Sequence, residues 1–305
     1  MKEEILKKIA GLKSLYNGPE LDKDKKSRAT VFNETGKIIL YPTELSYEVT
    51  KNDFFLPKGK CNRQVFFNFY EFEKTDPQSI TLLETYDLGK SVEYMIKKEL
   101  KLIGLADEEN FEVEFKQEFQ NSDVIVSGKK DVVLNDGTII EIKSTKDSEA
   151  GLKMIAVAPF SVHLPQLAMY LAERKLNGVE DPTMLVWYKG KIMLTNTVKV
   201  LKLQDDGFLN YDGALIPNYN FTSTISRMKD LEQAIKEKQI PKRDYPLITP
   251  ANAETLWSLG VITATHKSKV LKENKEALMW ECSECEYRSL CKAKDDETNW
   301  GYNFW

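Results

Sequence analysis

The stretch DVVLNDGTIIEIKS, residues 131–144, decides the fold class, because it encodes a β-hairpin. Two runs rich in β-branched residues flank Asn-Asp-Gly, which is a strong hairpin signal. With a three-residue loop, residues 135–137, and Gly137 in the left-handed conformation, Asp131 lies opposite Glu141 in the neighbouring strand. Two carboxylates facing each other with Cβ atoms about 5 Å apart repel, so we expect a cation between them. A two-residue Asp-Gly loop would instead send Asp131 to the other face.

The second strand of this hairpin places charged side chains on one face. Side chains alternate along a strand, so Glu141 and Lys143 share a face with Ile139. Opposed carboxylates form an oxygen-rich site suited to Mg²⁺ or Mn²⁺. Such an ion activates water, and a lysine beside it can stabilise charge on a phosphorus under attack. The pattern therefore predicts phosphodiester hydrolysis, and the alternative is a wet strand face with solvated charges.

Composition limits the class of protein. The chain has 305 residues, of which 42% are apolar and 30% charged, as in ordinary globular proteins. A net charge of −4 and a pI of about 5.6 give no overall basic footprint for nucleic acid. DNA contact would have to come from local patches, such as Lys58, Lys60 and Arg63, or Lys129, Lys130 and Lys146. Without a signal peptide or a membrane-length apolar run, we expect a cytoplasmic protein (the host cytoplasm if a phage encodes it).

Periodicity along the chain predicts alternating helices and strands. The expected elements are a helix over 1–16, a polar connector over 17–30, a strand over 37–41, a long helix over 79–104, a strand over 111–119, a helix over 161–176, a hairpin turning at Lys189-Gly190 and a Ser/Thr-capped helix over 222–240. They predict a mixed α/β core of about 200 residues. The predicted division is an N-terminal helix and connector (1–36), a core (37–245) and a C-terminal cysteine-containing subdomain (246–305).

Further polar residues accompany the hairpin in a fixed order. Gly89 and Glu93 lie four residues apart on the long helix, so they share a helix face. Gln166 and Tyr170 are spaced in the same way on a later helix. Gly128 precedes Asp131 by three residues.

This series resembles the PD-(D/E)xK nuclease superfamily, and within it the RecB-like nucleases. The resemblance implies a restriction-endonuclease-like core, with a mixed central sheet flanked by helices. It also implies roles for the matching residues: metal ligands at Glu93, Asp131, Glu141 and the main-chain carbonyl of Ile142; a catalytic lysine at Lys143; and Gln166 and Tyr170 positioning DNA or ordering the site. The chain departs from the pattern at Glu93, where many close relatives carry His, and at Lys130, where an apolar residue is more usual.

Four cysteines form a second constellation. Cys282, Cys285 and Cys291 lie close together, and Cys61 lies 220 residues before Cys282. Disulfides are rare in a cytosolic chain, so metal binding is the better interpretation. Four thiolates can hold zinc or an iron–sulfur cluster, and the ligand types alone do not decide between them.

The one-plus-three cysteine layout resembles that of iron–sulfur RecB-like nucleases, which include CRISPR-associated adaptation nucleases, the AddB nuclease domain and phage exonucleases. The resemblance implies a 4Fe–4S cluster that joins the two ends of the chain into one subdomain. The implied activity is a metal-dependent DNA exonuclease acting on single strands or DNA ends. The implied setting is recombination, repair, phage replication or CRISPR adaptation, with partner proteins of those processes, and a homo-oligomer stays open.

Two other hypotheses compete with the nuclease. One is a DNA-binding or assembly subunit that keeps the nuclease fold with weak catalysis. The other is a redox or zinc-binding regulator, which would leave the carboxylate site unexplained. An Asp131, Glu141 and Lys143 set intact in sequence favours the enzyme, because a simple clamp needs no such combination.

Overall fold

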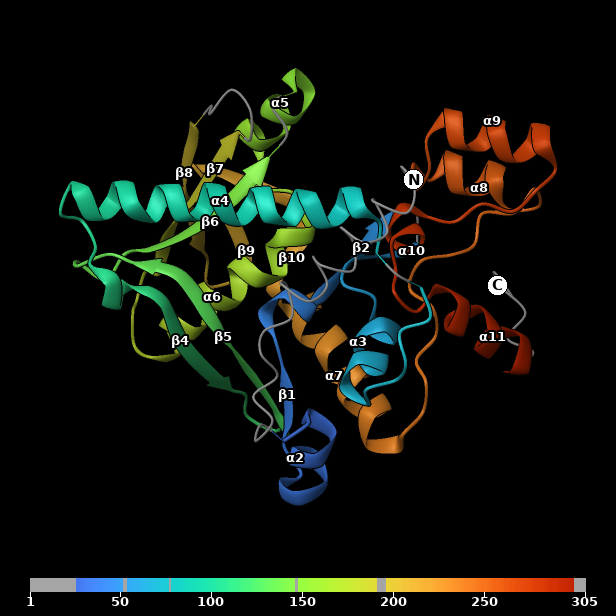
Figure 1. Cartoon of the computed structure of the whole chain (residues 1–305), viewed down its shortest axis with the longest axis horizontal. Coiled ribbons are helices and arrows are strands. Elements are labelled where there is room, and N and C mark those ends of the chain that lie inside the picture. Colours follow the sequence, from blue (N-terminus) through green and yellow to red (C-terminus); the bar gives the residue numbers. More distant parts are fainter. Residues whose placement is uncertain (1–25, 52–53, 77, 146–147, 191–195, 299–305) are drawn as a thin grey trace, which may run out of the picture.

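The computed structural model describes residues 26–51, 54–76, 78–145, 148–190 and 196–298 (Figure 1). The predicted helix over 1–16 and the aromatic tail after 298 lie outside the described residues. The strands are β1 (Ile38–Leu40), β2 (Ser46–Lys51), β3 (Phe54–Gly59), β4 (Phe111–Glu118), β5 (Val124–Val133), β6 (Ile139–Thr145), β7 (Thr183–Gly190), β8 (Asn196–Leu203), β9 (Phe208–Tyr211) and β10 (Ala214–Asn220). The α-helices are α2 (Arg28–Thr35), α3 (Asn62–Phe69), α4 (Ile80–Leu102), α5 (Glu149–Val157), α6 (Leu164–Leu176), α7 (Phe221–Glu237), α8 (Ala253–Ser258), α9 (Ala264–Glu273), α10 (Trp280–Ser283) and α11 (Arg288–Thr298).

A mixed sheet of eight strands forms the centre of the molecule. Its order is β1-β5-β6-β7-β8-β9-β10, and β4 also pairs with β5. The β1–β5 and β6–β7 pairs are parallel, and the other pairs in the sheet are antiparallel. Strands β2 and β3 form a separate hairpin. The predicted mixed α/β fold with a central mixed sheet flanked by helices is confirmed.

Helices cover both faces of this sheet. Helix α4 runs across the strands in Figure 1 and packs on one face. The apolar cluster beneath it consists of Val92, Ile96, Leu100, Ala106, Val132, Ile140 and Ile142. Helix α6 packs on the other face and is buried from Leu164 to Glu173. The alternation of β6 therefore has a physical cause, since Ile140 and Ile142 meet α4 whereas Ile139 belongs to the core around α6.

The hairpin between β5 and β6 has the predicted three-residue loop. Gly137 has a φ of 85°, in the left-handed region that favours glycine. The Leu134 amide donates to the Thr138 carbonyl at 2.8 Å, which closes the loop. The next pairs are Val133 with Ile139 and Val132 with Ile140, as the three-residue loop requires. The register that brings Asp131 toward Glu141 is thereby confirmed.

Three local predictions are wrong. The polar connector contains the start of α2, because Ser27 caps a helix there by accepting from the Thr30 amide. Residues Lys189 and Gly190 belong to β7, so the turn before β8 lies outside the described residues. Helix α7 is capped by Asn220, whose side chain accepts from the Thr222 amide.

Helices α5 and α6 lie in the connection between the parallel strands β6 and β7. Pro165 lies in the first turn of α6, where a missing amide hydrogen costs nothing. Within the described ranges, no single helix is long and apolar enough to cross a membrane. One pair, Gly151–Val157 with Ser161–Leu176, passes that test only jointly and is bent by 48°. Most of α6 is buried in the protein core, which accounts for its apolar composition.

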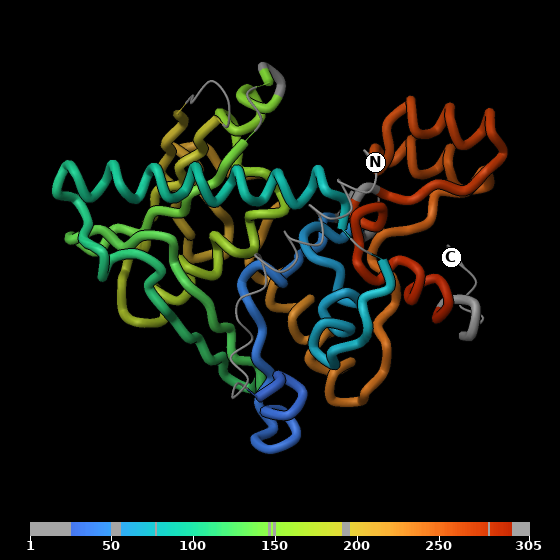
Figure 2. Tube along the Cα trace, viewed as in Figure 1, coloured from blue at the N-terminus to red at the C-terminus, as the bar shows by residue number. Residues whose placement is uncertain are grey.

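The C-terminal helices contact a segment more than 200 residues earlier in the sequence (Figure 2). Asp76 accepts hydrogen bonds from the Ser289 amide at 2.7 Å and from Arg288 at 2.9 Å, and the Thr75 hydroxyl accepts from the Leu290 amide. A segment distant in sequence thus caps the N-terminus of α11. Burial raises the pKa of Asp76, but the hydrogen bonds from Ser289, Thr75 and Arg288 outweigh burial and hold it at about 2.

Candidate metal centre

Asp131 lies where β5 and β6 separate. The two strands pair at Val132–Ile140 and Val133–Ile139 only. Beyond that point the Ile142 amide donates to Asp131 Oδ2 at 2.8 Å, so a carboxylate replaces a main-chain acceptor. This contact involves the amide of Ile142, and the predicted role of its carbonyl as a metal ligand stays a prediction. The separation of the strands places the Asp131 carboxylate between them.

Glu141 is fully buried, with a fractional exposure of 0%. Its Oε1 atom accepts from Lys143 Nζ at 2.5 Å and from Gln166 Nε2 at 2.8 Å. Its Oε2 atom is buried and has no hydrogen-bond partner among the described residues. A buried carboxylate oxygen without a hydrogen-bond partner lowers the stability of the fold. Native proteins retain such an atom mainly where a ligand binds to it. Oε2 is therefore a free donor atom for a hard cation.

The titratable groups of this centre affect one another. Burial and then the charge of the nearby Glu141 carboxylate raise the pKa of Asp131 to about 8. Burial also raises the pKa of Glu141, against the effect of Lys143. Burial opposes the charge of Lys143, but Glu141 and Asp131 outweigh it and raise the pKa of that ammonium group. The site thus holds carboxylates that gain from a nearby cation and a lysine that stays protonated.

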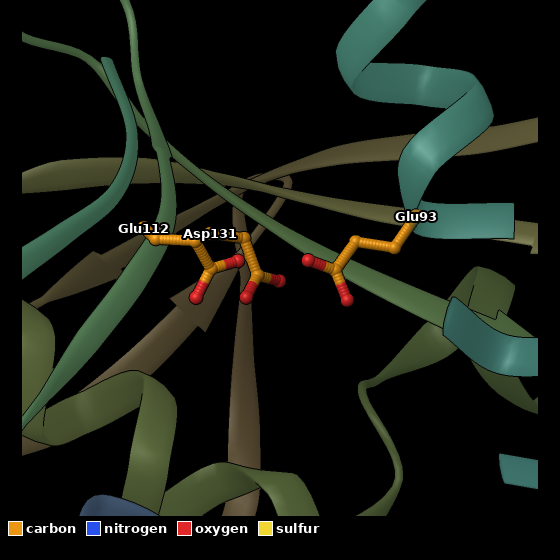
Figure 3. A group of neighbouring side chains, drawn as sticks. All are labelled: Glu93, Glu112 and Asp131. Atoms are coloured by element: carbon orange, nitrogen blue, oxygen red, sulfur yellow. The ribbon is translucent and has the colours of Figure 1, made fainter. Parts of the chain in front are cut away.

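Glu93 and Asp131 meet a third acidic residue that the sequence did not single out, Glu112. Carboxylate oxygens of the three lie within 4.8 Å of one another, and Figure 3 shows the side chains turned toward each other. Glu93 comes from α4 and Glu112 from β4. The β4–β5 register pairs residue 111 with 132 and 113 with 130, which places Glu112 beside Asp131. Burial, followed by the charge of Asp131, raises the pKa of Glu93.

Lys97 is a second residue that the motif reading missed. Its ammonium group forms ion pairs with both Glu93 and Glu112. The Lys97 side chain is 12% exposed, so this bridge is largely shielded from water. The sequence did contain a sign of the Glu93–Lys97 ion pair, because the two residues are four positions apart on a helix. That spacing is common on helices, so it did not single out Lys97.

Gln166 and Tyr170 order the other side of Glu141. Gln166 accepts from Lys143 at 3.0 Å and donates to the Tyr170 hydroxyl at 2.9 Å. That hydroxyl donates to the Lys129 carbonyl at 2.9 Å. Tyr170 is only 1% exposed, so its contacts are those of a residue that holds Gln166 in place. The chain of hydrogen bonds fixes the Glu141 and Lys143 side chains.

Close packing explains why Gly89 and Gly128 have no side chain. A Cβ at Gly128 would lie 2.8 Å from Pro42 Cδ, and one at Gly89 would lie 3.1 Å from Ser144 Oγ. Gly89 thus permits α4 to approach β6 next to the metal centre. The unusual Lys130 is also explained, because this buried side chain is paired with Glu173 at 2.7 Å.

The four cysteines line one pocket of about 420 Å³, which also contains Lys143, His163 and Gln166. None of them forms a disulfide. Burial raises the pKa of Cys282 to about 12, and Arg63 donates to Cys291 Sγ at 3.3 Å. In a tetrahedral zinc site with bonds of about 2.3 Å, sulfur atoms are about 3.8 Å apart. Within the described residues no three cysteine sulfurs lie within 4.8 Å of one another, so the thiols are not gathered as closely as in a closed zinc site.

Comparisons with known proteins give no family. No protein-family model and no curated protein matches the chain. Among solved structures, the crystal structure of SSO0001 is similar at a TM-score of 0.45 and 16% sequence identity, over 96% of this chain and 97% of that chain.

Proposed function

We propose that this chain is a divalent-metal-dependent DNA nuclease that hydrolyses phosphodiester bonds at single strands or DNA ends. The observation that carries the proposal is the buried Oε2 atom of Glu141, which has no partner and lies in a network with Asp131 and Lys143. The resemblance of the motif series to RecB-like nucleases supports the assignment to DNA.

The donor set fits Mg²⁺ or Mn²⁺. Asp131, Glu141 and Glu93 would hold the ion through carboxylate oxygens, which are the ligands these cations prefer. Bound there, the ion would supply Lewis-acid polarisation of a phosphoryl oxygen and acidify water. The raised pKa of Asp131 and of Glu93 reflects carboxylates crowded in a buried space, which a divalent cation relieves.

Lys143 acts as a hydrogen-bond donor and as a positive charge. The neighbouring Glu141 and Asp131 carboxylates outweigh burial and raise its pKa, which favours the ammonium form. Glu141 and Gln166 fix its position, and its side chain reaches the pocket. There it donates to a phosphate oxygen and stabilises the negative charge that grows as water adds to phosphorus and the ester P–O bond breaks.

The pocket that the four cysteines line also carries basic side chains, among them Lys143. Its cationic lining residues are Lys60, Arg63, Lys143, Arg243 and Arg288. Its carboxylates are Glu281 and Glu284. The volume of about 420 Å³ is in the range of ligand pockets. Positive charges outnumber negative ones in this lining, which favours an anion, either a phosphate group beside Lys143 or the thiolate-bound cluster proposed below.

Replacing Asp131 by Asn tests the function directly. We expect Asp131→Asn to cut end-labelled single- and double-stranded DNA at least about a hundredfold more slowly, because the amide is a poor ligand for a hard cation. Asn retains an oxygen for the Ile142 amide, so the fold should persist. Cleavage is measured with Mg²⁺, Mn²⁺ or EDTA, and the product ladder gives the polarity.

Asp136→Asn is the matched control, since Asp136 lies in the same hairpin and is exposed. Its amide oxygen can still accept from the Thr138 amide. Equal cleavage by both variants would contradict the assignment. A protein that binds DNA and Mn²⁺ but cuts nothing would favour the DNA-binding or assembly subunit.

We also propose that Cys61, Cys282, Cys285 and Cys291 hold a 4Fe–4S cluster in an N- plus C-terminal iron–sulfur subdomain. Four thiols facing one pocket, with Arg63 donating to a sulfur atom, support it. Bound there by all four thiolates, a cluster would link Cys61 to the three C-terminal cysteines. The described residues after 246 also have their own apolar cluster, formed by Ile248, Ala253, Leu256, Ile262 and Val270.

The Cys285→Ser variant tests the cluster. Purified without oxygen, the native chain should contain about four iron atoms, and Cys285→Ser should lose iron and visible absorbance, because serine does not replace a thiolate ligand. Asp131→Asn should keep both. Zinc in place of iron in the native chain, or full iron content in Cys285→Ser, would contradict the cluster.

A further inference from the structure

Glu112 takes part in the metal centre from an unexpected position. It is the second residue of β4, and its φ of 53° is in the left-handed region, which a non-glycine residue seldom adopts. The ladder skips it between Phe111 and Val113, so it lies beside Asp131 on the neighbouring strand. Residues of a regular strand have negative φ values, so the conformation of Glu112 is an exception within β4. The result is a carboxylate that faces Glu93 and Asp131 within 4.8 Å.

The position between Glu93 and Glu112 contains a cation of the protein itself. The ammonium group of Lys97 pairs with both carboxylates. Its ammonium group carries one charge on a flexible stem. A divalent ion carries twice that charge and accepts several oxygens at once. The two cations therefore compete for the same oxygen atoms.

Acidic side chains gather on many surfaces without binding a metal, so the cluster alone does not make a site. The independent observation is Glu141 Oε2, which is 0% exposed, has no partner, and belongs to the carboxylate that acts directly on Asp131 and Glu93. A buried oxygen without a partner, in a carboxylate whose charge interacts with those of Asp131 and Glu93, points to a ligand that the protein alone does not supply.

We propose that Glu112 is a further ligand of the divalent cation, and that Lys97 is a resident cation which the metal displaces from Glu93 and Glu112. The proposal rests on the metal-dependent function above and adds to it a ligand and a competitor. Lys97 keeps the carboxylates together in the metal-free protein and lowers the apparent affinity of the metal. Glu112 and Lys97 thus set the metal concentration at which the site fills.

The proposal predicts opposite effects for two variants. Glu112→Gln should weaken Mn²⁺ binding about tenfold or more, since even indirect partners of a metal contribute that much. Lys97→Met should strengthen Mn²⁺ binding about tenfold, because methionine keeps the apolar stem but removes the competing charge. The probe is Mn²⁺ alone, titrated into the full metal-free chain while free Mn²⁺ is followed by electron paramagnetic resonance. Thermal unfolding without metal shows that each variant is folded.

Matched controls are Glu114→Gln, on the same strand, and Lys98→Met, next to Lys97 on α4, since both side chains are exposed. Weaker binding by Glu112→Gln together with tighter binding by Lys97→Met supports the proposal. Glu112→Gln binding like Glu114→Gln, or Lys97→Met binding like Lys98→Met, overturns it. If binding is lost in Asp131→Asn and unchanged in Glu112→Gln, the metal-dependent function stands while this inference fails. If the native chain binds no Mn²⁺, both fail.

Discussion

Glu141→Gln is expected to reduce DNA cleavage about a thousandfold while making the metal-free protein more stable. The amide keeps an oxygen at the position of Oε1, which accepts from Lys143 and Gln166. Its NH₂ group takes the place of the unpartnered Oε2 and can donate to Asp131. Removing an unsatisfied buried oxygen and a like charge should stabilise the fold by about 1–3 kcal/mol. Lys143 is not left without a counter-charge, because Asp131 remains as a carboxylate that acts on it. The oxygen proposed to bind the metal is lost with the same substitution, which is why cleavage should fall.

The two effects are measured separately. Single-turnover cleavage with saturating Mn²⁺ gives the rate, and thermal unfolding in EDTA gives the stability. Glu114→Gln is the control for both. Unchanged cleavage would exclude Glu141 from the metal centre. A less stable variant in EDTA would mean that Oε2 has a partner in solution, and the strongest support for the site would be gone.

Lys143→Met is expected to slow cleavage about a hundredfold and to destabilise the fold by about 3–5 kcal/mol. The stability loss arises because Glu141, fully buried, is left beside Asp131 without its cation. Methionine has a similar length and fills most of the same volume. The destabilisation should therefore come from the missing charge and not from a cavity.

A double variant separates the two roles of Lys143. Combining Lys143→Met with Glu141→Gln removes both members of the buried pair, so most of the stability should return while cleavage stays low. Lys116→Met on β4 is the control, since that side chain is exposed. A Lys143→Met variant of native stability would show that the buried pair contributes little. One that cleaves at the native rate would remove Lys143 from the mechanism.

The hairpin could be predicted from sequence because its determinants are local. Asn-Asp-Gly specifies the loop, Gly137 takes the left-handed conformation, and the pairs beyond follow by counting. Continuing the same register to the next pair predicted that Asp131 lies near Glu141. It did not foresee that Asp131 would accept from the Ile142 amide, because the separation of the strands depends on packing beyond the hairpin.

Glu112 could not be found in the same way. Its place beside Asp131 depends on the register of β4 against β5, on a skipped residue in that register and on a positive φ. In the sequence FEVEFKQEF it is one of several alternating charges on a wet face. Strands β2 and β3, like β9 and β10, pair as hairpins between neighbouring segments. Asp212-Gly213 between β9 and β10 is a local turn signal that the sequence analysis did not use.

The cap that Asp76 and Thr75 provide for α11 has a consequence for biosynthesis. During translation, Cys61 and Asp76 emerge more than 200 residues before the helix they serve. The sheet and its carboxylates can therefore fold first, as domains do on the ribosome, while the N-terminus of α11 does not yet exist. Closure of so long a loop is slow, and it also brings Cys291 to the pocket. The sheet is thus assembled before Cys282, Cys285 and Cys291 join Cys61 at the pocket, so the cysteine set is completed last.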